Sequence, residues 1–200
     1  MKSSLLILIV FAIGLLVGYL QFFQDVSRLG EISTYILFGM MFLVGVSVGC
    51  DKNIKSQFKL KNLRILLIPV TVLVGTGLGM VFYHLLFKYP DATNLYAIGS
   101  GLGYYSLSSI VITKVSGETM GIVALLANII REITTLVLAP ILAKYFGKLA
   151  PIASAGATSS DTTLPIIMKY SGKEYVIISV FNGIILTLLV PVIIAMIYSI

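Results

Sequence analysis

The chain alternates between long apolar runs and short polar links, a pattern typical of a protein that crosses a membrane several times. A helix of about 20 apolar residues spans the hydrocarbon core of a bilayer. Five runs predict such spans: Leu5–Phe23, Ile32–Gly49, Ile65–Phe87, Thr119–Phe146 and Tyr175–Ser199. The first run is too long for the apolar core of a signal peptide and lacks a small-residue cleavage site, so we expect it to remain as a helix.

Two further segments, Leu95–Thr113 and Ala150–Met168, are apolar enough to enter the membrane but are rich in Gly, Ser and Thr. Unwound backbone at membrane depth is tolerated only where protein or water surrounds it. We therefore interpret each segment as a re-entrant hairpin or a broken helix, as secondary transporters use at their binding sites. An ordinary packed helix that is rich in small residues is the alternative.

The composition agrees with a membrane protein. Apolar residues make up 58% of the chain and charged residues 11%, well below the roughly 25% charged residues of a soluble domain. The net charge of +6 therefore does not indicate nucleic-acid binding, and we expect no such partner. The predicted fold class is an all-α polytopic membrane protein, with one transporter domain over residues 1–200.

Orientation follows from the basic residues, which are enriched in cytoplasmic loops. The link Cys50–Arg64 holds five of them: Lys52, Lys55, Lys59, Lys61 and Arg64. We therefore expect this link and the N-terminus to lie inside the cell and the C-terminus to lie outside, in contact with lipid along the spans.

An internal repeat relates the two glycine-rich segments. A shift of 55 residues aligns Lys114-Val-Ser116-Gly117 with Lys169-Tyr-Ser171-Gly172. The repeat divides the chain into three helices (1–94), a hairpin plus a helix (95–146) and a second hairpin plus a helix (150–200). Each unit of one hairpin and one span crosses the membrane an odd number of times, so tandem units must be inverted. The two hairpins should then enter from opposite sides and meet near the midplane, where transporters bind substrate.

Arg131 and Glu132 lie near the middle of the predicted span Thr119–Phe146. A charge at the bilayer centre costs about 2.5–3.5 kcal/mol on insertion scales, so such residues usually mark a substrate or proton pathway. Asn128 and Thr135 fall on the same helix face. The repeat makes Asp161 the nearest candidate partner. The functional hypothesis is a site for substrate or protons, and the alternative is a structural ion pair between Arg131 and Asp161.

The glycine-rich segments add groups that suit a carboxylate. Gly103–Ser106 and Gly156–Asp161 can each present backbone amides at the N-terminus of a half-helix, where the helix dipole favours an anion. The candidate residues for binding substrate or protons are Glu132, Asp161, Arg131, Asn128, Ser106, Ser108, Tyr105, Ser159, Ser160 and Thr162. We expect no catalytic residue, no metal site and no cofactor other than a coupling ion, H⁺ or Na⁺.

Three motifs in this order resemble the lysine exporter family of bacterial inner-membrane proteins: GLGYYSLSS, Asn128-x-x-Arg131-Glu132 followed by Pro140, and GATSSDTTLP. The resemblance covers most of the chain and is strongest from Tyr96 onward. It implies export of L-lysine, and of analogues such as thialysine, across the plasma (inner) membrane of a bacterium or archaeon. It also implies that intramembrane acidic residues matter for activity. Glu132 is the matching position, and Asp161 belongs to the last motif.

The resemblance corresponds to the C-terminal two-thirds of the usual family member, which carries further N-terminal helices. We therefore expect either a homo-oligomer or a complex with a small membrane protein that supplies those helices. In mechanism, we expect an antiporter in which Glu132 exchanges a proton for the ammonium group of lysine.

Other function classes remain open on the residues alone. A sodium-coupled carrier for an organic anion or another amino acid could use the same broken hairpins, since Ser, Thr and Asp also coordinate sodium. A membrane-embedded enzyme is less consistent, because the chain lacks HExxH and any Ser–His pair at a workable spacing. We therefore expect no enzyme. A scaffold without transport activity would leave Glu132 unexplained.

Overall fold

The computed structural model describes residues 2–20, 64–88 and 91–199, with isolated residues between 35 and 50. These residues form helices joined by turns, with no strand in those ranges, so the all-α prediction is confirmed. The span expected at Ile32–Gly49 and most of the basic link Cys50–Arg64 lie outside the continuously described ranges. The elements are α1 (Lys2–Tyr19), α4 (Arg64–Phe87), α5 (Ala92–Gly99), α6 (Tyr105–Ser116), α7 (Glu118–Tyr145), α8 (Ala150–Ala155), η1 (Gly156–Ser160), α9 (Leu164–Ser171), η2 (Lys173–Tyr175) and α10 (Val176–Ser199).

Three of the described helices are long and apolar enough to cross a membrane: Leu67–Phe87, Glu118–Tyr145 and Lys173–Ser199. They correspond to α4, α7 and α10, whose ends differ by at most one residue from the spans predicted at Ile65–Phe87, Thr119–Phe146 and Tyr175–Ser199. The chain is therefore a multi-pass membrane protein.

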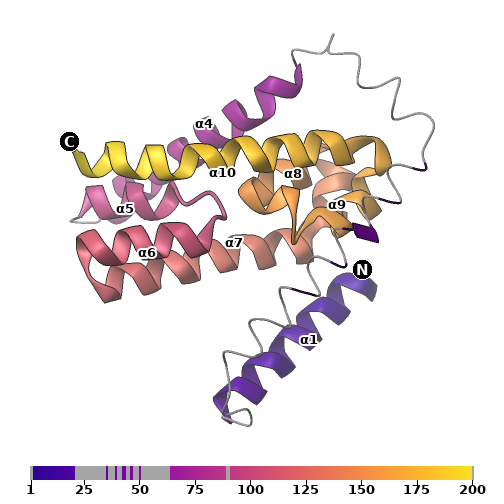
Figure 1. Cartoon of the computed structure of the whole chain (residues 1–200), viewed down its shortest axis with the longest axis horizontal. Helices are drawn as coiled ribbons and strands as arrows, with labels where there is room; N and C mark the ends of the chain where they lie inside the picture. The colour runs from indigo at the N-terminus through magenta and orange to yellow at the C-terminus, as the bar shows by residue number, and fades with distance from the viewer. Residues whose placement is uncertain are drawn as a thin grey trace.

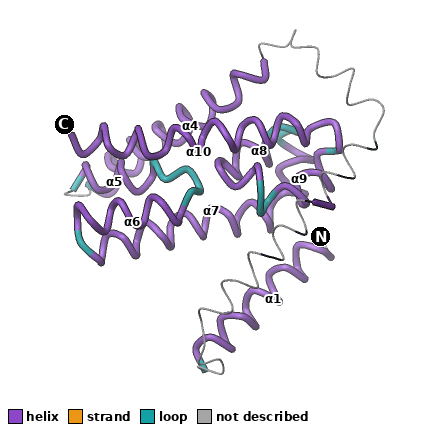
Figure 2. Tube along the Cα trace, in the orientation of Figure 1, coloured by secondary structure: helices purple, strands orange, loops and turns teal. Residues whose placement is uncertain are grey.

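Both glycine-rich segments are interrupted, which excludes a single continuous helix in either one. A turn separates α5 from α6, and the 3₁₀ segment η1 with the turn after it separates α8 from α9 (Figure 2). Gly103 and Gly156 lie at these breaks with φ of +97° and +66°. Glycine adopts positive φ readily because it has no Cβ, so these residues place the breaks where they are. We call residues 100–104 the first tip and residues 156–163 the second tip.

The two interrupted segments lie at opposite ends of the molecule. Figure 1 shows α5 and α6 beside the C-terminal end of α10, and α8 and α9 beside its N-terminal end. Helices α5, α6 and α9 each contact both α7 and α10. One buried cluster joins Leu102 of the first tip and Ala157 of the second tip to Ala124 of α7 and Leu186 of α10. The hydrophobic core therefore holds both tips between the two long helices.

The motif shared by the two units has the same local structure in each. Gly117 ends α6 with φ of +87° and ψ of +170°, and Gly172 ends α9 with φ of +119° and ψ of +159°. Gly117 lies between α6 and α7, and Gly172 lies between α9 and the short η2 that leads into α10. The Lys-x-Ser-Gly sequence therefore marks the same kind of corner twice.

Candidate functional site

The two tips touch through their backbones. The N–H of Ala157 donates to the carbonyl oxygen of Leu102 at 2.8 Å. A Cβ on Gly103 would lie 2.9 Å from the carbonyl oxygen of Ala155, and a Cβ on Gly156 would overlap the carbonyl oxygen of Leu102. Both glycines are therefore needed for the close approach of the tips as well as for their positive φ.

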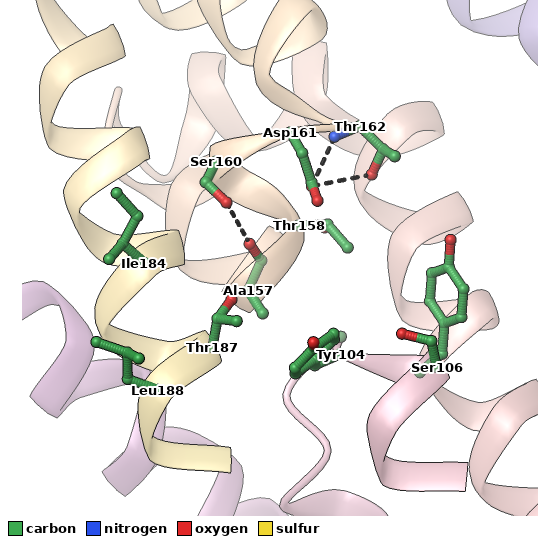
Figure 3. A pocket seen from close by; sticks show the side chains of 12 residues that line it. Tyr104, Ser106, Ala157, Thr158, Ser160, Asp161, Thr162, Ile184, Thr187 and Leu188 are labelled. Atoms are coloured by element: carbon green, nitrogen blue, oxygen red, sulfur yellow. Dashed lines mark hydrogen bonds between the residues drawn. The ribbon is translucent and has the colours of Figure 1, made fainter. Parts of the chain in front are cut away.

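A cavity of about 340 Å³ opens beside this contact, bounded by the two tips, the start of α6 and one face of α10 (Figure 3). Its volume lies in the range of small-molecule pockets, about 300–1,000 Å³. The cavity is lined by Gly103, Tyr104, Tyr105, Ser106, Ala157, Thr158, Ser160, Asp161, Thr162, Ile184, Thr187 and Leu188. The polar groups come mainly from the tips and the start of α6, and the apolar wall comes from α10.

One carboxyl group, that of Asp161, lines the cavity, and a second, that of Glu132, lies nearby. Oδ1 of Asp161 accepts the backbone N–H of Thr162 at 2.6 Å and the Thr162 hydroxyl at 3.4 Å. The Thr162 hydroxyl also lies near enough to the Glu132 carboxyl group to interact with it, and Glu132 lies within electrostatic range of Asp161. Asp161 lines the cavity, and Glu132 of α7 lies behind it and interacts with the same threonine, so we call these two residues the acidic pair.

The opposite wall offers backbone donors. Helix α6 begins at Tyr105 without a side-chain cap. The backbone N–H groups of Ser106 and Leu107 have no acceptor within the described part of the chain, whereas the N–H of Ser108 donates to the carbonyl of Tyr104. Ser106 lines the cavity. This end of α6 therefore places free donors and the positive end of the helix dipole beside the cavity.

Asn128 supports the first tip and does not line the cavity. Its Oδ1 accepts the backbone N–H of Gly103 at 2.7 Å. Its Nδ2 donates to the carbonyl of Ala124 at 2.8 Å and to the Ser108 hydroxyl at 3.4 Å. Asn128 and Ser108 are both buried, so these two predicted site residues connect the first tip and α6 to α7.

Arg131 binds the C-terminal end of α8. Its Nε donates to the carbonyl of Ser154 at 2.9 Å, and Nη2 donates to the carbonyl of Ala153 at 3.3 Å. Nη1 reaches the Thr76 hydroxyl of α4 at 3.3 Å. No ion pair joins Arg131 to Asp161 among the residues that the structure describes. The guanidinium instead stabilises the negative end of a short helix, where cations are favoured.

The second tip is fixed to α10 through Ser179 and Asn182, two residues of α10 that the sequence analysis did not select. Ser159 and Ser179 exchange two hydrogen bonds, each hydroxyl donating to the other residue's carbonyl, at 2.9 and 2.7 Å. Nδ2 of Asn182 donates to the carbonyl of Gly156 at 3.1 Å and to the Ser159 hydroxyl at 3.0 Å. Ser159 is thus a buried contact with α10. Asn182 could have been noticed as an amide inside an apolar span, because polar residues in such spans often join helices.

Of the predicted site residues, five line the cavity: Tyr105, Ser106, Ser160, Asp161 and Thr162. Glu132 lies next to them through Thr162. Asn128, Arg131, Ser108 and Ser159 hold the surrounding elements in place. The structure shows no cluster of His, Cys, Asp and Glu that could bind a metal ion among the residues it describes.

A polytopic helical protein with interrupted helices meeting at an acidic cavity has the architecture of a secondary transporter. The chain belongs to the lysine exporter family: the family model described as Lysine exporter LysO matches residues 8–198. The resemblance drawn from the three motifs is thereby confirmed, and the family is one of transporters and not of enzymes.

Two relatives extend this comparison. The chain is 35% identical over 195 residues to a protein named Lysine exporter LysO from Escherichia coli, covering 98% of the chain and 62% of that relative. It is 32% identical over 183 residues to a protein named Putative lysine exporter from Haemophilus influenzae, covering 90% of each. The chain therefore spans 62% of the length of the first relative and most of the second. No solved structure matches it.

Proposed function

We propose that this protein exports L-lysine, and analogues such as thialysine, across the bacterial inner membrane in exchange for protons. The cavity between the two tips carries this proposal, because Asp161 lines it with Glu132 close behind, and Ser106 at the uncapped start of α6 lines it as well. The names of the two relatives support lysine as the substrate.

The charges of the site suit the charges of lysine. The α-carboxylate of the substrate binds the N–H groups of Ser106 and Leu107 at the start of α6, where the helix dipole favours an anion. The ammonium groups bind Asp161 and Glu132. Lysine carries two ammonium groups and one carboxylate, so it needs more negative than positive partners, and the acidic pair supplies them.

Proton exchange follows from the closeness of the two carboxyl groups. Their mutual repulsion falls when a proton or a substrate ammonium group neutralises one of them. Substrate and proton therefore compete for the pair, and Glu132 is the proposed proton carrier. Lysine moving outward would be coupled to a proton moving inward, which makes the protein an antiporter.

The proposed architecture is an inverted repeat of five spans and two re-entrant hairpins, with the N-terminus inside and the C-terminus outside. Two observations support it: the interrupted segments lie at opposite ends of the molecule (Figure 1), and Gly117 and Gly172 form equivalent corners. In such transporters one repeat moves against the other around a fixed central site. The two tips are the proposed place of that movement.

Reconstitution of the purified chain into liposomes tests the function directly. An imposed inward proton gradient should drive loaded lysine out of the liposomes, and a sodium gradient should have no effect. Glu132→Gln should abolish this transport, while Glu118→Gln, at an exposed position of the same helix, should not. Sodium-driven uptake of an organic anion would contradict the proposal. Transport by the chain alone would favour a homo-oligomer, and transport that needs an added small membrane protein would favour a complex.

A further inference from the structure

A continuous chain of hydrogen bonds crosses the molecule from α10 to α7 through both tips. Nδ2 of Asn182 donates to the carbonyl of Gly156 at 3.1 Å. The same peptide group carries the N–H of Ala157, which donates to the carbonyl of Leu102 at 2.8 Å. The peptide group that contains the Leu102 carbonyl also carries the N–H of Gly103, which donates to Oδ1 of Asn128 at 2.7 Å.

All three bonds point in one direction, from a donor on α10 to an acceptor on α7. Peptide groups that are hydrogen-bonded in series polarise one another, so each bond strengthens the others in a low-dielectric interior. The two asparagine side chains are buried and close the chain at its ends. Leu102, in the middle, has φ of +49°, an uncommon conformation for a residue with a branched side chain.

We infer that Asn128 and Asn182 are positioning residues that hold the two tips closed through this chain, and that the bond between Leu102 and Ala157 is the gate of the transporter. This inference rests on the proposed function in one respect, namely that the tips must separate for a substrate to pass. This bond is the one link of the hydrogen-bond chain that joins the two repeat units, because Leu102 belongs to the first unit and Ala157 to the second. Each tip keeps its own asparagine when that bond opens.

The geometry shows how the amide at each end is oriented. Asn128 accepts from Gly103 with Oδ1 while its Nδ2 donates to Ala124 and Ser108. Asn182 turns its Nδ2 toward the carbonyl of Gly156 and the Ser159 hydroxyl, and its Oδ1 has no partner within the described structure. A buried acceptor without a partner destabilises the protein. Asn182 is thus oriented for donation to the second tip, although its other end remains unpaired.

A double-mutant cycle with a cysteine reporter tests the chain. In a Cys50→Ser background, which removes the only cysteine, Thr158→Cys places a thiol on the second tip, at a cavity-lining position that is only 4% exposed while the tips are closed. The rate of its modification by a membrane-impermeant thiol reagent reports how often the tips separate. Asn128→Leu and Asn182→Leu should each raise that rate by about fivefold, the effect of losing one ordinary hydrogen bond. The double variant should react only as fast as the single variants, because either change breaks the same chain.

Ser179→Ala is the matched control. It removes a hydrogen bond between α10 and the second tip that is not part of the chain, so its effect should multiply with that of Asn128→Leu. Rates that multiply in the Asn128–Asn182 double variant, or single variants that leave the rate unchanged, would overturn the inference. If a leucine variant fails to fold, Asn128→Ser and Asn182→Ser give the same cycle with smaller side chains that do not reach their partners. Labelling requires no substrate, so a failed lysine assay would contradict the proposed function without altering this result.

Discussion

Arg131 donates from Nε to the backbone carbonyl of Ser154 at 2.9 Å, which makes this buried cation a partner of α8. Its neighbour in the sequence, Glu132, lies instead beside Thr162 and Asp161. Two adjacent charges on one helix therefore have different surroundings. The arginine fixes the short helix that leads into the second tip, and the carboxyl group interacts with the second tip itself.

Arg131→Met should destabilise the protein, because it leaves the carbonyls of Ala153 and Ser154 without their donor. Each unpaired buried carbonyl costs about 1–3 kcal/mol. Arg131→Lys should recover only part of the loss, since an ammonium group cannot reproduce the planar fork of a guanidinium. The midpoint of thermal unfolding in detergent measures both variants. A variant that kept wild-type stability and lost only lysine binding would show that Arg131 contacts the substrate.

Asp161→Asn should reduce lysine transport at least tenfold without lowering the unfolding midpoint. The reason is that Asp161 has no ion pair with Arg131 in the described structure, so its charge is available to the cavity. Glu132→Gln should have the same signature, with the Glu118→Gln variant as control. Transport rates in proteoliposomes and thermal unfolding of the same preparations separate the two effects. Loss of stability in Asp161→Asn with transport intact would restore the structural interpretation of this residue.

The long spans could be predicted from the sequence because apolar run length is set by membrane thickness. Helices α4, α7 and α10 start and end within one residue of the predicted limits. The interruptions were also predictable, since Gly103 and Gly156 stand where a continuous helix would be weakest. The pattern of apolar residues cannot predict which neighbouring element each polar side chain contacts. Asn128 and Arg131 share a helix face with Thr135, yet each of them binds a different neighbouring element.

The residues that the sequence analysis missed are those whose role depends on a distant partner. Asn182 and Ser179 lie in a span that is otherwise almost entirely apolar, and their importance follows from contact with Gly156 and Ser159. Asn182 is 26 residues from Gly156 in the sequence, and Ser179 is 20 residues from Ser159. The 55-residue repeat aligns Asn182 with Ala127, the residue before Asn128, and not with Asn128 itself. Register alone therefore could not have paired the two asparagines.

The side of the membrane on which each interrupted segment begins stays a prediction, and single-cysteine labelling tests it. A cysteine at Lys114 should react with an impermeant reagent from outside the cell, and one at Lys148 should react only from inside. Both positions are exposed in the structure. The physical reason is that a hairpin returns to the side from which it entered. Full spanning by both segments would reverse the result, with Lys114 inside and Lys148 outside.

Gly156→Ala should disrupt the contact between the tips, and Gly147→Ala provides a matched control. Both glycines have positive φ, +66° and +94°, so alanine at either position carries a backbone cost of about 1–3 kcal/mol. A Cβ at Gly147 meets no atom within 4 Å, whereas a Cβ at Gly156 would overlap the carbonyl oxygen of Leu102 and lie 3.2 Å from Nη2 of Arg131.

The Gly147 variant should therefore lose some stability and keep transport. The Gly156 variant should lose more stability and lose transport. It should also show faster modification of the cysteine at position 158, because the bond from Ala157 to Leu102 can no longer form. Equal loss of stability in the two variants, with transport retained in both, would mean that the tips are not closely packed and that the contact between Leu102 and Ala157 has no part in gating.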